Sequence, residues 1–132
     1  MVIDTSAIVA ILLDEVERDA FSQLIAAESA LAMSIMTFHE AAIVMAGKKQ
    51  NTLAAALVDE FAREASIEIV PLGIEGSLDA RAAYFRFGRG YHAARLNLAD
   101  CFSYSLAKTR NEPLLFKGDD FAKTDIVAAW RP

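Results

Sequence analysis

The sequence predicts an α/β fold in which a central, mainly parallel sheet of four or five strands is flanked by helices. Short apolar runs alternate with helical patterns along the whole chain, and strands that are joined through helices run parallel to one another. The length of 132 residues fits a single domain spanning residues 1–132 with one core. Hydrophobic residues make up 55% of the chain, which is enough for a sizeable core and excludes a disordered chain.

The strands are predicted from short apolar runs. Met1 to Ile3 is a buried run at the start of the chain, and the β-rich run that contains Ile67 and Val70 is closed by Pro71. The run from Leu31 to Met36 is ambiguous, because alanine and methionine also suit helices. In chain order, the strands are expected at residues 1–3, 31–36, 67–70 and 113–116, with 126–129 as a candidate fifth strand at an edge.

The helices are predicted from their periodicity and from the residues that can cap them. Thr5 or Ser6 can cap the first helix, Thr37 can open the third, and Asn51 and Asn97 can cap later ones. In chain order, the helices are expected at about residues 7–13, 16–28, 37–47, 52–65, 74–87 and 98–110.

Composition limits the classes of function and the compartment. The formal net charge of −5 argues against a non-specific nucleic-acid coat, but it does not exclude an enzyme that acts on nucleic acid. Cys101 is the single cysteine, so a reducing compartment is expected. The first fifteen residues carry Asp4 and Asp14 and no basic residue, unlike a secretory signal, and no apolar run is long enough to span a bilayer. The expectation is a soluble, cytoplasmic protein without a membrane partner.

Acidic residues recur where a predicted strand ends or a predicted helix begins. They are Asp4, Glu40, Asp100 and the pair Asp119 and Asp120. In an open parallel sheet these positions meet at one edge, where ligands bind. Carboxylates that converge there repel one another and need a cation, and Mg²⁺ prefers oxygen ligands while it keeps several waters. The pattern therefore indicates a magnesium site and hydrolysis of a phosphodiester.

Each acid also has a purely structural interpretation. Thr37 with Glu40 has the spacing of a capping box, as has Asn97 with Asp100. Asp4 fits this interpretation least, because it directly follows an apolar strand and other residues could cap the next helix. All the acids fall on the same edge of the sheet, and a scaffold that needed only caps would not require acids at every one of these places.

Three motifs resemble the PIN-domain ribonucleases. Residues 1–7 (MVIDTSA) look like the opening of that family, and residues 98–107 (LADCFSYSLA) and 114–121 (LLFKGDDF) look like the VapC toxins within it. The resemblance covers the whole chain, and it implies a PIN-like three-layer sandwich. It also implies the toxin half of a type II toxin–antitoxin pair, an Mg²⁺-dependent endoribonuclease that cleaves RNA, often tRNA or rRNA. Its expected partners are the RNA, a VapB-type antitoxin and a second copy of the chain in a homodimer, with a toxin–antitoxin hetero-oligomer.

The resemblance also implies site residues. Asp4, Glu40 and Asp100 match the acidic triad of the family and are expected to hold the metal and to act in catalysis. Asp119 is favoured as the fourth acid because it lies nearer the strand end, and Asp120 is the alternative. Mg²⁺ is the expected cofactor, with Mn²⁺ able to substitute.

Further residues are candidates for orienting the carboxylates or for binding RNA. The hydroxyls of Thr5, Ser6 and Thr124 can orient carboxylates or water, although ordinary capping explains them equally well. Basic and aromatic side chains interleave in the loop-like stretch before Asp100, where arginine can bind phosphate and aromatics can stack on bases. The predicted RNA contacts are Arg89, Tyr91, His92, Arg95 and Lys117, whereas Phe85 and Phe87 are predicted to be core residues.

Two alternative functions remain open at this point. One is a DNA or flap nuclease on the same fold, against which the small size of the chain argues. The other is a non-catalytic α/β module that binds a partner and uses the acids as caps.

Overall fold

The computed structural model describes residues 1–131 and contains one four-stranded parallel sheet. The strands are β1 (Val2–Ile3), β2 (Ala32–Ser34), β3 (Glu68–Val70) and β4 (Leu114–Leu115), and their order in the sheet is β3-β2-β1-β4. Val2 pairs with Ala32 on one side and with Leu114 on the other. The first strand is therefore central, and the chain that leaves its carboxyl end emerges in the middle of the sheet edge.

Six α-helices and two short 3₁₀ helices surround this sheet within residues 1–131. They are α1 (Thr5–Leu12), α2 (Arg18–Ala27), α3 (Ile35–Lys49), η1 (Thr52–Ala55), α4 (Ala56–Glu64), α5 (Ile74–Phe87), α6 (Leu98–Arg110) and η2 (Phe121–Lys123). None of the helices described is both long and apolar enough to cross a bilayer.

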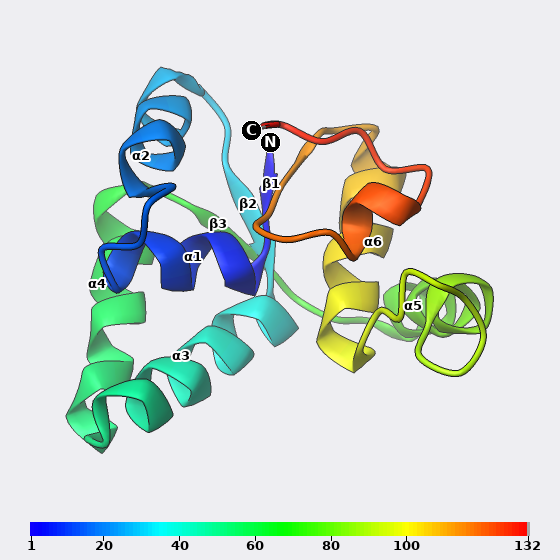
Figure 1. Cartoon of the computed structure of the whole chain (residues 1–132), viewed down its shortest axis with the longest axis horizontal. Coiled ribbons are helices and arrows are strands. Elements are labelled where there is room, and N and C mark those ends of the chain that lie inside the picture. Colours follow the sequence, from blue (N-terminus) through cyan, green and yellow to red (C-terminus); the bar gives the residue numbers. More distant parts are fainter. Residues whose placement is uncertain (132) are drawn as a thin grey trace.

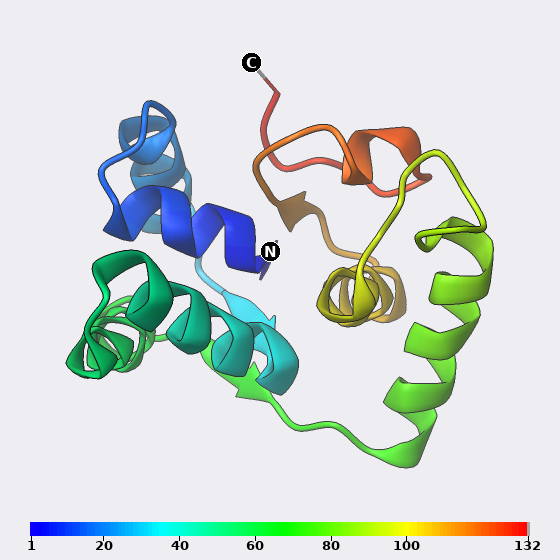
Figure 2. The same cartoon turned by 60° about the horizontal axis from the view of Figure 1, so that its bottom comes forward.

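The sheet separates two hydrophobic cores. Successive strand residues point to opposite faces, so Ile3 packs with α1 to α4 while Val2 packs with α5 and α6. Figure 1 shows α1, α3 and α4 on one side of the strands and α5 and α6 on the other. In Figure 2, α6 lies between α5 and the sheet, and α5 packs mainly against α6. The predicted α/β sandwich with a parallel sheet is confirmed.

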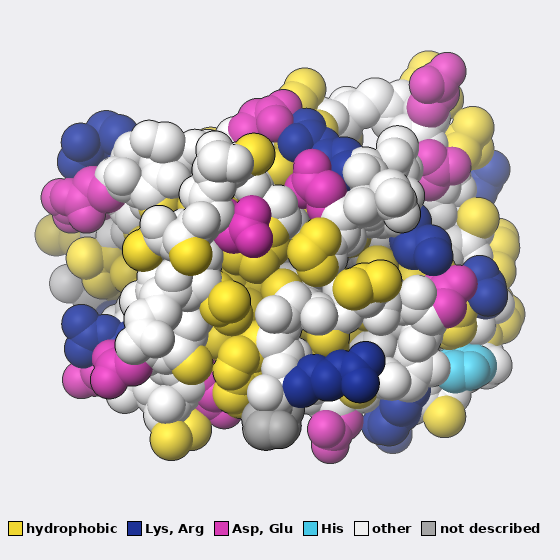
Figure 3. Space-filling view, turned by 90° about the horizontal axis from the view of Figure 1, so that it is seen from above, with side chains coloured by type: hydrophobic (Ala, Val, Ile, Leu, Met, Phe, Trp, Pro, Cys, Tyr) yellow, Lys and Arg dark blue, Asp and Glu magenta, His cyan; other side chains and the backbone are white. Residues whose placement is uncertain are grey.

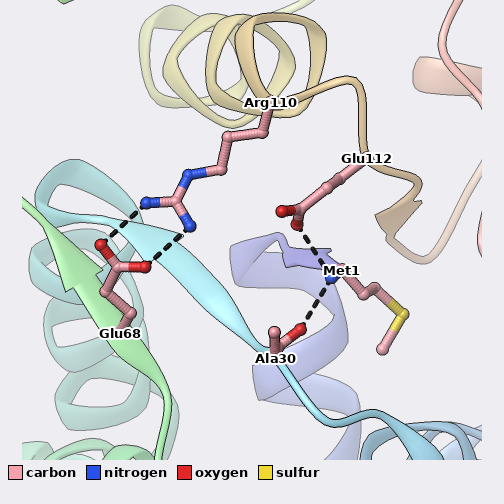
Figure 4. A network of polar contacts seen from close by, with 5 residues as sticks. All are labelled: Met1, Ala30, Glu68, Arg110 and Glu112. Atoms are coloured by element: carbon pink, nitrogen blue, oxygen red, sulfur yellow. Dashed lines mark hydrogen bonds and ion pairs between the residues drawn. The ribbon is translucent and has the colours of Figure 1, made fainter.

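The amino end of the sheet is fastened by ion pairs (Figure 4). Arg110, at the end of α6, donates two hydrogen bonds to Glu68 at the start of β3, at 2.7 and 2.8 Å. The Met1 ammonium donates to the carbonyl oxygen of Ala30 at 2.8 Å and pairs with Glu112 at 2.8 Å. These contacts connect three of the four strands to α6 and to the segment that leads into β4.

The boundary between β2 and α3 differs from the prediction. The strand ends at Ser34, whose hydroxyl accepts from the Thr37 backbone N–H at 2.9 Å and so caps α3. The Thr37 side chain is buried and shares a hydrogen bond with Ser103 of α6 at 2.9 Å. Thr37 therefore lies inside the helix, and the predicted capping box with Glu40 is wrong.

Two further boundaries shift. The second helix begins at Arg18 and not near Val16, which is 92% exposed. The candidate fifth strand is reduced to one parallel bridge, in which Ala128 pairs with Leu114 beyond β4.

Candidate functional site

Asp4 lies at the carboxyl end of the central strand and is almost completely buried, with 2% of its surface exposed. Its Oδ2 accepts from the Ser6 backbone N–H at 2.9 Å and from the Ser6 hydroxyl at 2.6 Å, so Asp4 itself caps α1. The predicted caps Thr5 and Ser6 lie inside the helix. Within residues 1–131, Asp4 Oδ1 is buried and has no hydrogen-bond partner, which is costly for a carboxylate unless a cation or a polar ligand meets it.

Glu40 reaches the same region from α3. It is the sixth residue of that helix and not a first-turn residue, so the helix dipole does not account for it. Its Oε2 accepts from the Thr5 hydroxyl at 2.6 Å. Burial raises the pKa of the Glu40 carboxyl, the Thr5 hydrogen bond lowers it, and the negative charge of Asp4 raises it again.

Asp100 enters from the start of α6, on the opposite side of the sheet. Asp100 Oδ2 accepts from the Asn97 N–H at 2.7 Å, and Asn97 Oδ1 accepts from the Asp100 N–H at 2.8 Å, which forms the predicted capping box. Burial is the main reason that the pKa of Asp100 rises to about 7, followed by the charge of Asp4 and smaller contributions from Glu40 and Asp120. The Asn97 hydrogen bond opposes this rise in pKa.

The two adjacent acids after β4 have different surroundings. Asp120 is the one whose charge acts on Asp100. Asp119 lines a separate hollow of 620 Å³ together with Glu17 and Trp130. Gly118, with a φ of +97°, provides the left-handed turn before this pair. The structure therefore brings Asp120 toward the other acids and turns Asp119 toward the C-terminal segment.

The three buried or half-buried acids share one arrangement. In each, one carboxylate oxygen accepts from a local donor, supplied by Ser6, Thr5 or the Asn97 backbone. No protein donor within the described chain contacts the other oxygen of Asp4, and none of the acids forms an ion pair there. Neutral donors fix the orientation of these carboxylates without neutralising their charge.

This donor set fits a hard cation such as Mg²⁺. The atoms available to a metal ion are carboxylate oxygens. A cation would stabilise the buried Asp4 Oδ1 most, because this oxygen has no hydrogen-bond partner within residues 1–131. In residues 1–131 no group of three His, Cys, Asp or Glu side chains lies close enough together to coordinate a metal ion by itself. Mg²⁺ keeps several waters and needs only one or two carboxylates, so neighbouring acids suffice.

The predicted RNA contacts divide into two groups. Arg89, Tyr91, His92 and Arg95 are exposed on the loop between α5 and α6. In contrast, the Lys117 ammonium donates to Glu15 at 2.7 Å and to Glu17 at 2.8 Å. Lys117 thus ties the turn after β4 to the loop between α1 and α2, and its charge is already compensated.

Thr124 and Phe85 also differ from their predicted surroundings. The Thr124 hydroxyl donates to the Phe121 carbonyl oxygen and accepts from the Ile126 N–H, so its hydrogen bonds stay within its own turn. Phe85 is 57% exposed and contacts Tyr91, which contradicts its assignment to the core. Phe87 is buried, as predicted.

Comparison with known proteins identifies the family. The PIN domain matches residues 1–127. Ribonuclease VapC30 of Mycobacterium tuberculosis is 41% identical over 132 residues, which is 100% of both chains. Ribonuclease VapC of Mycolicibacterium smegmatis is 42% identical over 128 residues, covering 97% of this chain and 98% of that protein. The chain belongs to the PIN-domain family. Within that family it is grouped with the VapC ribonucleases, as the three sequence motifs predicted.

Two solved structures share the fold at low sequence identity. VapC20 of Mycobacterium tuberculosis, described as a sarcin-ricin loop cleaving toxin, superposes with a TM-score of 0.79 at 16% identity, covering 99% of this chain and 98% of that one. A chain of a toxin–antitoxin complex from Klebsiella pneumoniae gives a TM-score of 0.69 at 19% identity, over 97% and 95% of the two chains. The arrangement of sheet and helices is thus shared with VapC20 and with a chain of the Klebsiella complex.

Proposed function

We propose that this PIN domain is an Mg²⁺-dependent endoribonuclease and the toxin of a VapBC-type pair, which hydrolyses phosphodiester bonds in RNA such as tRNA or rRNA. The observation that carries the metal dependence is the buried Asp4 Oδ1, which lacks a protein partner within residues 1–131. Capping explains only the other oxygen of Asp4. A structural role alone therefore leaves a buried anionic oxygen unsatisfied.

Asp4, Glu40 and Asp100 would hold the metal, with Asp120 favoured over Asp119 as the fourth acid. When bound, Mg²⁺ would supply a nucleophilic water and neutralise the charge that develops on the phosphate. The chain's own contribution is positional. Ser6 orients Asp4, Thr5 orients Glu40, and the Asn97 backbone orients Asp100.

The state of Asp100 before metal binding follows from its surroundings. With a pKa raised to about 7, mainly by burial and then by Asp4, Asp100 is partly protonated at neutral pH in metal-free protein. A cation stabilises the ionised form, so binding releases a proton. Mn²⁺, with the same preference for oxygen ligands, would substitute for Mg²⁺.

The partners in this proposal are RNA, a VapB-type antitoxin and a second copy of the chain. Seen from above, hydrophobic side chains form a patch in the middle of the molecule with charged side chains around it (Figure 3). Large apolar side chains are also exposed at Val16, Ile43 and Leu53. Exposed apolar surface of this kind is typical of interaction sites. Mass measurement of the protein alone and with its antitoxin would test the homodimer and the hetero-oligomer.

The decisive experiment is RNA cleavage by purified, antitoxin-free protein with Mg²⁺ and with EDTA. The variants Asp4→Asn and Asp100→Asn keep a side-chain oxygen for their caps, so they test charge and not folding. Asp59→Asn, an exposed acid on α4, is the matched control. Cleavage that requires Mg²⁺ and is lost in the two site variants but kept in Asp59→Asn supports the proposal. Cleavage that survives in Asp4→Asn would contradict it.

A further inference from the structure

A pocket of 420 Å³ lies between α5 and α6, beside the start of α6. Leu98, Cys101 and Phe102 line it from α6, and their i, i+3, i+4 spacing places them on one face of that helix. Asp100 points to the other side, because two helical positions after Leu98 correspond to a rotation of about 200°. The amino terminus of α6 thus separates the carboxylates from this pocket.

The lining of the pocket suits a flat aromatic ligand. Ala80 and Cys101 are buried at its base, and the half-buried rings of Tyr84 and Phe102 form parts of its wall. Unpaired RNA bases bind by stacking on aromatic side chains of this kind. A volume of 420 Å³ lies within the range of small-molecule sites.

Two arginines with uncompensated charge border the pocket. Arg81 and Arg89 are exposed and line it, and neither forms an ion pair within residues 1–131, whereas the Arg86 and Arg110 guanidiniums contact acids. In a chain with a net charge of −5, free guanidinium groups beside an apolar pocket indicate an anionic ligand. Arginine binds phosphate oxygens through two parallel hydrogen bonds.

The arginine loop is held in place. The Arg89 N–H donates to the Leu96 carbonyl oxygen and the Leu96 N–H to the Phe87 carbonyl oxygen, both at 3.0 Å. A Cβ at Gly88 would lie 2.4 Å from the Tyr84 carbonyl oxygen, so only glycine lets the chain leave α5 this close to the helix. Backbone hydrogen bonds therefore fix the side of the pocket that carries Arg89.

We propose that this pocket binds one nucleobase of the RNA strand, next to the phosphodiester at the carboxylates, and that Arg81 and Arg89 bind the adjoining phosphates. The inference rests on the proposed ribonuclease activity and assigns part of its substrate site. A helix with its side chains is about 10 Å across, a span that neighbouring nucleotides of an extended strand cover.

A first test does not depend on cleavage. Amide chemical shifts of metal-free, full-length protein are followed while adenosine, guanosine, cytidine or uridine 5′-monophosphate is added, with ribose 5-phosphate as the control without a base. At least one nucleotide should shift the amides of Tyr84, Arg89 and Phe102, and ribose 5-phosphate should not. Equal shifts with ribose 5-phosphate, or no shift at these residues with any nucleotide, would overturn the proposal.

A second test fills the pocket. Ser77 is exposed and lines it, so Ser77→Trp places an indole inside, whereas Leu78→Trp adds the same group at the next exposed position, outside the lining. Because the loss of one stacked base typically weakens binding by roughly 5- to 150-fold, Ser77→Trp should lower kcat/KM for RNA by a factor in that range. Arg89→Gln should also lower it, and Arg63→Gln on α4 should not. Cleavage by Ser77→Trp at the rate of Leu78→Trp would overturn the proposal.

The two tests separate this inference from the ribonuclease proposal. If wild-type protein cleaves no RNA, the nucleotide titration still reports on the pocket. If Ser77→Trp cleaves RNA normally but loses affinity for the antitoxin, the pocket belongs to that protein partner and the nucleobase assignment is overturned.

Discussion

The two ends of the sheet treat negative charge in opposite ways. At the amino end, Glu68 and Glu112 each face a cation, the Arg110 guanidinium and the Met1 ammonium. At the carboxyl end, the acids around Asp4 face hydroxyl and amide donors and no cation within residues 1–131. Ion pairs therefore stabilise the amino end, whereas the acids at the carboxyl end continue to repel one another.

The difference teaches how orientation and neutralisation can be separated. A lysine beside Asp4 would fix the carboxylate and also cancel its charge, leaving little attraction for a metal ion. A serine hydroxyl fixes it and leaves the charge. Lys117, three residues before Asp120, is held by Glu15 and Glu17 instead.

The largest expected effect comes from removing an orienting hydroxyl at the carboxyl end. In Ser6→Ala, Asp4 Oδ2 loses its 2.6 Å hydrogen bond, and the Lys117 N–H loses its acceptor. We expect a loss of roughly 10- to 100-fold in activity or in Mg²⁺ affinity, measured as the cleavage rate against Mg²⁺ concentration. Ser22→Ala, on the exposed side of α2, is the control. Equal behaviour of the two variants would show that the Ser6 hydroxyl does not orient Asp4.

Adding Mg²⁺ should neutralise the acids at the carboxyl end of the sheet and so stabilise the protein. Mg²⁺ at 100 times its dissociation constant should stabilise metal-free protein by about 2.7 kcal/mol, seen as a rise in Tm at constant ionic strength. Asp4→Asn should show little of this rise. An equal rise in both proteins would place the ion elsewhere.

Neutralising one repelling acid should stabilise the metal-free protein. Because the folded-state pKa of Asp100 is raised to about 7, chiefly by burial and then by Asp4, its ionised form disfavours the folded state. This free-energy cost reaches its full size above about pH 7 and disappears as the pH falls toward the ordinary pKa of aspartate. At about 1.4 kcal/mol for each pKa unit of this rise, Asp100→Asn should therefore gain a few kcal/mol at pH 8 and much less at pH 4.5. Urea unfolding at both pH values measures it, and a pH-independent gain would refute this origin.

The smallest effect is expected at the amino end. Arg110 lowers the pKa of Glu68 through its hydrogen bonds, so the pair stabilises the fold above the ordinary pKa of glutamate and stops doing so in acid. Both side chains are partly exposed, and water and salt screen such pairs. Glu68→Gln should lower Tm slightly at neutral pH and low salt, with no loss of cleavage. A large loss of activity would mean that the two ends of the sheet are coupled.

Much of the fold could be predicted because strands and helices alternate with clear periodicity. The start of α3 could not, because Ser34 and Thr37 are both good caps and the Ala-Met run between Leu31 and Met36 suits either structure. Long-range contacts decide where α3 starts. Ser34 pairs with Val70 in the sheet, and the Thr37 hydroxyl forms a hydrogen bond with Ser103 of α6.

The candidate site was predictable by residue type but not in detail. Asp4 lies at a strand end and Asp100 in the first turn of a helix, as the sequence predicts, whereas Glu40 lies one turn further along α3 than predicted. Gly118 marks a turn before Asp119 and Asp120, but the residue types do not specify the backbone angles that decide which of the two acids turns inward. Lys117 could not be excluded as an RNA contact, because its partners Glu15 and Glu17 lie about 100 residues earlier in the chain.

The capping roles of Asp4 and Asp100 have an evolutionary consequence. Asparagine caps a helix about as well as aspartate, so under the proposed function a change from Asp to Asn at either position would abolish cleavage and leave both helix starts intact. A gene inactivated in this way would still produce a folded protein with the same outer surface. This inactive protein would compete with an active homologue for the same antitoxin. It would therefore act as a decoy and not as a null allele.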